Sequence, residues 1–249
     1  NMPFCDEFII VTKESYRNIV NGQMKAFQSL KYRVVLEGSP KGTAAAIMLG
    51  SQFCNQSELV FVVTADNLIE GQEYKDAIIR AKELAKQGSI VALGVKPAKK
   101  NSNFGYLLRD EENVLKFIEK IRLDDDESFG YDDGFLWNSG MFLYRAGDLI
   151  NAARAICPEL YDTCRMAKRK VAAIRRTVRF SQKVMKDIPQ GSIERLIFEK
   201  LKDMKVVETA FRWKDVGNVC DLDENSSVSH SENVLKNHCE DVMVINSAD

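Results

Sequence analysis

Apolar and polar positions along the first hundred residues follow two alternating patterns. Short apolar runs rich in β-branched residues predict buried strands at 7–12, 32–38, 58–66 and 89–97. Segments with helical spacing of apolar residues lie between them and predict helices up to about residue 29, at 43–53 and at 72–87. This alternation is typical of βαβ units around a parallel sheet. The run 58–66 is apolar throughout, so we expect it to be covered on both faces.

The pattern changes beyond residue 100. The segment 103–120 predicts two strands around a turn at 110–113, and an acidic loop follows at 124–134. Helical spacing then predicts a long helix over about 146–176 and another over about 192–201. A strand that runs into a turn is expected at 205–218, and a last apolar run lies at 241–247.

Composition limits the class of protein. A chain of 249 residues with 45% hydrophobic residues can form one large α/β domain with a full core. Charges nearly cancel, with a net charge of -1, which argues against a nucleic-acid or membrane-surface protein. No apolar run approaches the roughly 18 residues of a transmembrane helix, and no signal peptide opens the chain. We therefore expect a cytoplasmic protein without a membrane partner.

One basic stretch offers an alternative. Within residues 164–179, several basic side chains could bind RNA or another anionic surface: Lys168, Arg169, Lys170, Arg175, Arg176 and Arg179. Ala and Val at helical spacing, and the lack of interleaved aromatic residues for base stacking, favour a solvated helix face instead. No nucleic-acid partner is expected.

Cysteine and histidine usage narrows the chemistry. None of the six cysteines forms a C-x-x-C pair, so a zinc site is not indicated and free thiols in a reducing compartment are expected. The two histidines, His230 and His238, lie in the polar C-terminal stretch. A mechanism built on a histidine base is therefore unexpected.

A polar triplet interrupts the apolar run 135–146. Asn138, Ser139 and Gly140 stand between aromatic and aliphatic residues. One interpretation is a β-bulge or a bend, where glycine is common. The other is that Asn138 presents its amide to a polar ligand and Gly140 lets that ligand approach the backbone.

Other polar residues follow apolar strands and also allow two interpretations. Asp66 and Asp215 are either turn residues or carboxylate ligands for a hard cation such as Mg²⁺ together with substrate phosphates. The loop before Thr43 precedes a helix N-terminus, which can receive a phosphate or the polar edge of a base, although it is neither a Walker nor a Rossmann motif. Glu119 and Lys120 are either a surface pair or site residues.

Taken in order, these pieces resemble a known family. The motifs are E-G-S-P-K-G-T-A-A-A-I at 37–47, A-D at 65–66, F-G-Y at 104–106, I-E-K at 118–120, W-N-S-G-M-F at 137–142, S-I-E at 192–194 and W-K-D-V-G at 213–217. Their order and spacing resemble the sugar-nucleotide pyrophosphorylases, and among these the mannose-1-phosphate guanylyltransferases. The resemblance covers roughly residues 8–222.

The resemblance implies a fold and its limits. Residues 1–222 would form a three-layer α/β/α Rossmann-like nucleotidyltransferase domain with a mainly parallel central sheet. Residues 223–249 would begin a C-terminal β-rich segment or linker.

The resemblance also implies a role for each matching residue. Asn138 and Glu119 would bind the sugar hydroxyls, and Gly105 would pass its backbone close to the sugar. Lys120 would meet the phosphate of the sugar 1-phosphate. The remaining roles are nucleotide-base binding by Gly42, Thr43 and Ala44, and Mg²⁺ binding by Asp66 and Asp215.

The implied reaction joins a sugar 1-phosphate, mannose 1-phosphate above all, to a nucleoside triphosphate, GTP above all, and releases pyrophosphate. Such chemistry needs positioning, a metal and cationic groups, and no protein nucleophile. The enzyme could form a homo-oligomer. The alternative is a non-catalytic homologue that binds a sugar phosphate or nucleotide and acts as a regulator.

This sequence departs from the family pattern at several places, of which two matter most. Asn67 stands where the family has a histidine after the A-D pair. The glycine-rich loop with which the family opens, and its preceding strand, have no counterpart. We therefore expect an upstream strand beside the 58–66 strand, Met2 at a broken sheet edge, and no turnover by residues 1–249 alone.

Overall fold

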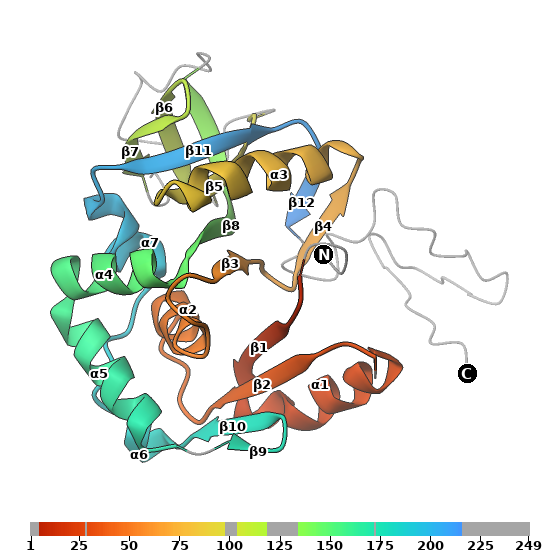
Figure 1. Ribbon diagram of the computed structural model, residues 1–249, viewed down its shortest axis with the longest axis vertical. Helices are drawn as coiled ribbons and strands as arrows, with labels where there is room; N and C mark the ends of the chain where they lie inside the picture. Colours follow the sequence, from red (N-terminus) through yellow and green to blue (C-terminus); the bar gives the residue numbers. More distant parts are fainter. Residues whose placement is uncertain (1–4, 28, 98–103, 119–133, 172, 216–249) are drawn as a thin grey trace, which may run out of the picture.

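Figure 1 shows the computed structural model, which describes residues 5–27, 29–97, 104–118, 134–171 and 173–215. Its strands are β1 (Phe8–Lys13), β2 (Tyr32–Glu37), β3 (Leu59–Val62), β4 (Asn67–Glu70), β5 (Ile90–Val95), β6 (Tyr106–Asp110), β7 (Asn113–Ile118), β8 (Phe135–Arg145), β9 (Ala173–Ile174), β10 (Thr177–Phe180), β11 (Met204–Thr209) and β12 (Arg212–Asp215). Its α-helices are α1 (Arg17–Met24), α2 (Thr43–Ser51), α3 (Glu73–Lys86), α4 (Ala146–Ile156), α5 (Pro158–Arg169), α6 (Gln182–Met185) and α7 (Ile193–Leu196). Short 3₁₀ turns are η2 (Glu14–Tyr16), η3 (Lys25–Phe27) and η4 (Phe198–Lys200).

The described strands form three sheets. One sheet has the order β1-β2-β10-β9, a larger one has the order β3-β8-β5-β11-β7-β6, and β12 pairs with β4 in a two-stranded ribbon. In Figure 1 the four-stranded sheet lies in the lower half and the six-stranded sheet in the upper half, with α2 between them. The α/β class expected from the sequence is confirmed.

The expectation of a mainly parallel sheet is wrong for the described residues. Parallel pairing occurs between β1 and β2, β2 and β10, and β5 and β11. The long strand β8 instead runs antiparallel to β3, β5 and β6. The strands β6, β7 and β8 therefore extend the sheet by antiparallel pairing rather than by further helical crossovers.

Burial differs from the expectation for the strand at 58–66. Of this run only Leu59–Val62 form a strand. All four residues are half-buried, because in the described part of the chain β3 is an edge strand that pairs with β8 alone. The strand covered on both faces is β5, whose six residues are all buried. An apolar run identifies a strand of the sheet, but its place in the strand order decides how deeply it is buried.

Helices cover both faces of the six-stranded sheet. Val91 and Leu93 of β5 point to one core cluster, which contains the buried side chains of α3. Ile90 and Ala92 point to the other cluster, together with residues of α2, α4 and α5. This alternation is the period of two that a strand imposes on its side chains.

The long helix expected at 146–176 is broken. α4 ends at Ile156, and α5 begins at Pro158, which is the favourable first position for proline. Beyond Arg169 the chain forms the β9–β10 hairpin, so the basic stretch 164–179 does not lie on one helix face. Several of its cations have partners: Lys168 lies over the Phe53 ring and Arg179 pairs with Glu14.

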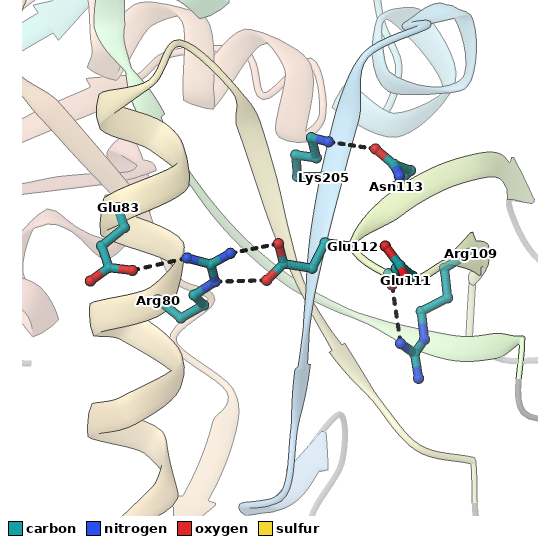
Figure 2. Close-up of polar contacts among 7 residues, drawn as sticks. All are labelled: Arg80, Glu83, Arg109, Glu111, Glu112, Asn113 and Lys205. Atoms are coloured by element: carbon teal, nitrogen blue, oxygen red, sulfur yellow. Dashed lines mark hydrogen bonds and ion pairs between the residues drawn. The ribbon is translucent and has the colours of Figure 1, made fainter.

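Charged contacts hold the tip of the β6–β7 hairpin (Figure 2). Arg80 of α3 donates two hydrogen bonds of 2.7 Å to the carboxylate of Glu112 and one of 3.0 Å to Glu83. Lys205 of β11 donates to the side chain of Asn113. The hydrogen bonds from Arg80 lower the pKa of Glu112. Bidentate geometry makes such a contact more directional than an ordinary surface pair.

Two strand edges lie over one core. Among the strands that the structure describes, β1 pairs only with β2, and β3 pairs only with β8. Ile9 and Val11 of β1 and Val60 and Val62 of β3 nevertheless pack against the same core cluster. No strand among the described residues occupies the open edges of β1 and β3. Met2 lies outside the described residues, and the expected upstream strand stays a prediction.

Glu37, at the end of β2, is a buried carboxyl group in this core. Its side chain is only 6% exposed, and its Oε1 has no hydrogen-bond partner among the described residues. Burial raises the pKa of Glu37 to about 7. Burial also raises the pKa of the nearby Cys164 thiol to about 12, and the negative charge of Glu37 contributes to that rise. An ionised Glu37 would leave an unpaired charge in the core.

Glu37 therefore predicts a loss of stability as the pH rises. The folded state holds its proton between pH 4.5, the ordinary value, and about 7, so unfolding becomes easier as pH rises through this window. We expect Glu37→Gln to unfold like the wild type at pH 4 but to be more stable at pH 8, by up to about 3 kcal/mol. Denaturant titrations at both pH values measure this, with the exposed Glu199→Gln as control. An equal difference at both pH values would contradict the prediction.

Candidate active site

The polar triplet of β8 is a bulge at the point where this strand changes partners. Trp137, just before it, pairs with Tyr106 of β6, whereas Phe142, just after it, pairs with Val62 of β3. The register with β5 shifts between Ala92 and Gly94 at the same place. The bulge interpretation is therefore confirmed, and it places a kinked, polar stretch of backbone between β6 and β3.

Local hydrogen bonds fix the bulge. Gly140 has φ +72° and donates its N–H to Asn138 Oδ1 at 3.1 Å. Ser139 Oγ donates to the Leu93 carbonyl at 2.6 Å and accepts from the Met141 N–H at 3.2 Å. These bonds orient the Asn138 amide, whichever ligand it meets.

Asn138 connects two segments that are remote in sequence. Its backbone N–H donates to the Gly105 carbonyl at 2.8 Å, so these two predicted sugar-site residues are neighbours. Its Nδ2 donates to Oε1 of Glu194, at the start of α7, at 3.2 Å. Glu119 and Lys120 lie outside the described residues, so their predicted roles stay predictions.

The two predicted metal ligands lie at one end of the β4–β12 ribbon. Asp215 is paired with Asn67, the residue that follows Asp66. Asp66 is exposed in the turn before β4, and Asp215 is half-buried. Asn67 Nδ2 donates to the Ser139 carbonyl at 3.2 Å and so ties this end of the ribbon to the bulge. Two aspartates 149 positions apart in the chain thus reach one part of the molecule.

The N-terminus of α2 is packed against the segment 191–194. Gly42 has φ 94° and ψ 179°, and a Cβ there would lie 2.4 Å from the Gly191 carbonyl oxygen. Ala44 N donates to the same oxygen at 3.2 Å, and Ile193 N donates to Thr43 Oγ1 at 3.0 Å. The Thr43 hydroxyl and the Ala44 N–H therefore have partners within the protein, and their predicted place beside a base stays a prediction.

Aromatic side chains form a cluster beside the bulge. The ring centroid of Phe104 lies 5.2 Å from that of Trp137 and 4.9 Å from that of Trp213. Both indole Nε1 atoms are buried and have no hydrogen-bond partner among the described residues. Buried donors without a partner are uncommon, and they are candidates for a contact with a ligand or an ordered water.

Three residues of this region received no role from the sequence. Glu194, Trp137 and Trp213 lie inside the quoted motifs, next to residues that did receive one. The S-I-E triplet is the sequence feature that could have identified Glu194. Its first residue, Ser192, is the N-cap of α7 and accepts a hydrogen bond from Arg195 N at 3.3 Å. Its contact with Asn138 joins positions 56 residues apart and could not be read from spacing.

Helices around mixed sheets, with polar and acidic residues gathered at the β8 bulge and at one end of the β4–β12 ribbon, define a nucleotidyltransferase-like α/β protein. The chain belongs to the nucleotidyl transferase family, whose sequence profile matches residues 3–232.

Curated relatives and solved structures agree with this assignment. The chain is 28% identical over 93% of its length to mannose-1-phosphate guanylyltransferase RfbM of Salmonella typhimurium, and 30% identical over 92% of its length to that of Salmonella montevideo. It spans 51% of each, about half of their length. A crystal structure of mannose-6-phosphate isomerase from Helicobacter pylori is 31% identical with a TM-score of 0.81, each chain being covered to 86%.

A more distant structure shares the fold alone. The crystal structure of mannose-1-phosphate geranyltransferase from Thermus thermophilus is 22% identical with a TM-score of 0.68, over 86% of this chain and 62% of that one. No helix in the described part of the chain is long and apolar enough to cross a membrane.

Replacing either of two glycines that have an unusual backbone conformation by alanine should lower the free energy of unfolding, by different amounts. Gly140 needs a left-handed φ, but a Cβ there would meet only Thr64 Cγ2 at 3.5 Å, so Gly140→Ala should cost about 1–2 kcal/mol. Gly42 occupies a region nearly restricted to glycine and would clash with Gly191, so Gly42→Ala should cost about 3 kcal/mol or more. Denaturant unfolding at 25 °C measures both. Equal losses would show that Gly191 does not approach Gly42 this closely.

Proposed function

We propose that the protein transfers a nucleotidyl group from a nucleoside triphosphate, specifically GTP, to a sugar 1-phosphate, specifically mannose 1-phosphate. The observation that carries the proposal is a chain of hydrogen bonds across the candidate site. It runs from Asn67, which follows Asp66 and pairs with Asp215, through the bulge and residues 193–194 to Thr43 at the start of α2. Groups suited to a sugar, a metal and a nucleotide thus border one region.

Relatives support the choice of substrates. The curated relatives are named for guanylyl transfer to mannose 1-phosphate, and the Helicobacter pylori structure is named for an isomerase of mannose 6-phosphate. These names share a mannose phosphate, which supports that sugar class for this chain. Residues 42–44 lie in a G-T-A-A-A sequence, which does not specify guanine. The choice of GTP therefore depends on the names of the relatives rather than on residues of the site.

On the sugar side, the proposal assigns polar groups around the bulge. Asn138 keeps one Nδ2–H and one Oδ1 lone pair beyond its bonds to Glu194 and Gly140, and these would meet sugar hydroxyls. Gly105 would pass close to the sugar, since it is held directly against Asn138. The indole N–H groups of Trp137 and Trp213 are further donors beside it. Glu119 and Lys120 complete this side by resemblance.

In this proposal, Asp66 and Asp215 would hold a Mg²⁺ ion. Mg²⁺ prefers one or two carboxylates together with substrate phosphates and water. The described residues contain no group of three or more His, Cys, Asp or Glu side chains that could hold a metal. A cation here would therefore depend on phosphate oxygens as well, as expected for a metal that arrives with a nucleotide.

The chemistry needs no protein nucleophile. A phosphate oxygen of the sugar 1-phosphate attacks the α-phosphorus, a new P–O bond forms, and the bond to the β-phosphate breaks to release pyrophosphate. The bound metal would neutralise charge on the phosphates. The role of the protein is to hold both substrates in line and to place cationic and amide groups around the transferred phosphorus.

Thiol chemistry is consistent with a cytoplasmic enzyme. The four described cysteines, Cys5, Cys54, Cys157 and Cys164, are free. Free thiols are typical of a reducing compartment. A cytoplasmic location is therefore part of the proposal, and a homo-oligomeric state stays a prediction from the sequence.

Loss of either aspartate should lower the metal-dependent activity. In the full-length protein, Asp66→Asn and Asp215→Asn should each lower kcat/KM for pyrophosphate release from GTP and mannose 1-phosphate on the order of 100-fold or more, because each removes a carboxylate from the metal. Raising Mg²⁺ should restore part of the loss. The control is Asp162→Asn on α5, where Asp162 is 57% exposed and pairs with Arg165.

Two results would overturn the proposed function. One is wild-type protein that binds both substrates but releases no pyrophosphate with Mg²⁺, which would support the regulatory homologue instead. The other is full activity in both aspartate variants.

Replacement of Asn138 should weaken the binding of the sugar phosphate more than that of the nucleotide. Asn138→Ala should weaken mannose 1-phosphate binding by roughly 1–3 kcal/mol, because hydroxyl groups lose their partner. Binding of GTP should change less. Calorimetric titrations with each substrate measure the two affinities. A larger loss for GTP than for mannose 1-phosphate would place Asn138 on the nucleotide side.

A further inference from the structure

The segment Gly191–Glu194 touches both halves of the candidate site within four residues. At its first residue, the Gly191 carbonyl accepts from Ala44 N at 3.2 Å, and Gly191 N donates to the Lys41 carbonyl at 2.9 Å. At its last residue, Glu194 Oε1 accepts from Asn138 Nδ2 at 3.2 Å. One short segment therefore holds both the start of α2 and the amide of the bulge.

The segment is anchored, so a displacement at one end reaches the other. Ile193 is fully buried, and its N–H donates to Thr43 Oγ1 at 3.0 Å. Gly42 packs so tightly on Gly191 that a Cβ would lie 2.4 Å from the carbonyl oxygen. Packed groups of this kind transmit small displacements instead of absorbing them.

Glu194 is an unusual residue for a purely structural anchor. It is only 9% exposed, and no cation among the described residues pairs with it. Its Oε1 accepts from Asn138 Nδ2, and the second carboxylate oxygen, Oε2, can accept further hydrogen bonds. Burying a carboxylate without a cation is costly, which is more readily explained if its acceptor oxygen has a task.

We propose that Gly191–Glu194 couples occupancy of the nucleotide half to that of the sugar half, with Glu194 as the positioning residue for Asn138. Nucleotide bound at the start of α2 fixes Gly42–Ala44 against Gly191 and Ile193. Glu194 is then held where its oxygen orients the Asn138 amide toward the sugar hydroxyls. The inference rests on the proposed function, since it concerns the same two substrates.

Coupling predicts that each ligand tightens the other, by the same factor. The test is calorimetric titration of the full-length protein with mannose 1-phosphate, with and without a GTP analogue whose α–β bridging oxygen is replaced by methylene. We expect the analogue to strengthen mannose 1-phosphate binding about fivefold or more in the wild type. The reverse titration should give an equal factor.

Variants separate the acceptor groups from general packing. Thr43→Val removes the acceptor for Ile193 N, and Glu194→Met removes the acceptor for Asn138. Each should bring the coupling factor close to one, and Glu194→Met, which lies on the sugar side, should also leave the affinity for the nucleotide analogue alone within about threefold. Glu194→Gln keeps an acceptor oxygen and should keep the coupling. Thr163→Val, which breaks a 2.6 Å bond from a threonine to the Glu159 carbonyl on α5, is the matched control.

Each outcome has one meaning. Failure of wild-type protein to bind either probe, or competition between the probes, would overturn the proposed function itself. Binding of both probes with a coupling factor of one would overturn only the inference. So would unchanged coupling in both Thr43→Val and Glu194→Met, or loss in Thr163→Val. If Thr43→Val fails to fold, as judged by its thermal transition, Glu194→Met and Glu194→Gln decide the question.

Discussion

The packing of α2 is the constraint on which the rest of the structure depends. No strand pairing joins the four-stranded and six-stranded sheets among the described residues, so α2 and the core around it connect them. Small residues allow the close approach: Ala44 and Ala45 are fully buried, and a Cβ at Gly50 would lie 3.3 Å from Val11. On the other side, Ser51 shares a buried hydrogen bond of 3.1 Å with Tyr144 of β8. Burial raises the pKa of Tyr144.

This packing also determines where the candidate site forms. Because α2 is fixed between the sheets, its N-terminus lies against residues 191–194. These residues in turn contact Asn138 on β8, so the first turn of α2 and the bulge border the same site. The bulge of β8 forms the sugar side of the candidate site. There β8 stops pairing with β6 and starts pairing with β3, and Asn138 lies at this change of partner. A structural requirement of the sheet and a polar group for a ligand thus occupy the same three residues. The two interpretations of the triplet are compatible, since a kinked strand exposes polar backbone and side-chain groups.

Much of the fold followed from local patterns in the sequence. The strands near 7–12, 32–38 and 89–97, the helices near 43–53 and 72–87, and the hairpin around 110–113 all occur close to the expected bounds. Pro158 could have corrected the single long helix, since proline favours the first turn of a helix. By contrast, the strand β4 escaped notice because its four residues alternate between half-buried and exposed and pair only with β12.

The sequence by itself determined the α/β class, most element positions and the residues with suitable chemistry. Those properties depend on residue type and on spacing over one or two turns or strand repeats. The tertiary structure decided the strand order, the antiparallel course of β8, the half-burial of β3 and the meeting of Asp215 with Asn67. It alone revealed that Glu194 reaches Asn138 and that Gly191 packs against the start of α2. Such contacts join residues 56 to 150 positions apart. A local sequence pattern does not specify which distant strands pair or which distant side chains form hydrogen bonds with each other.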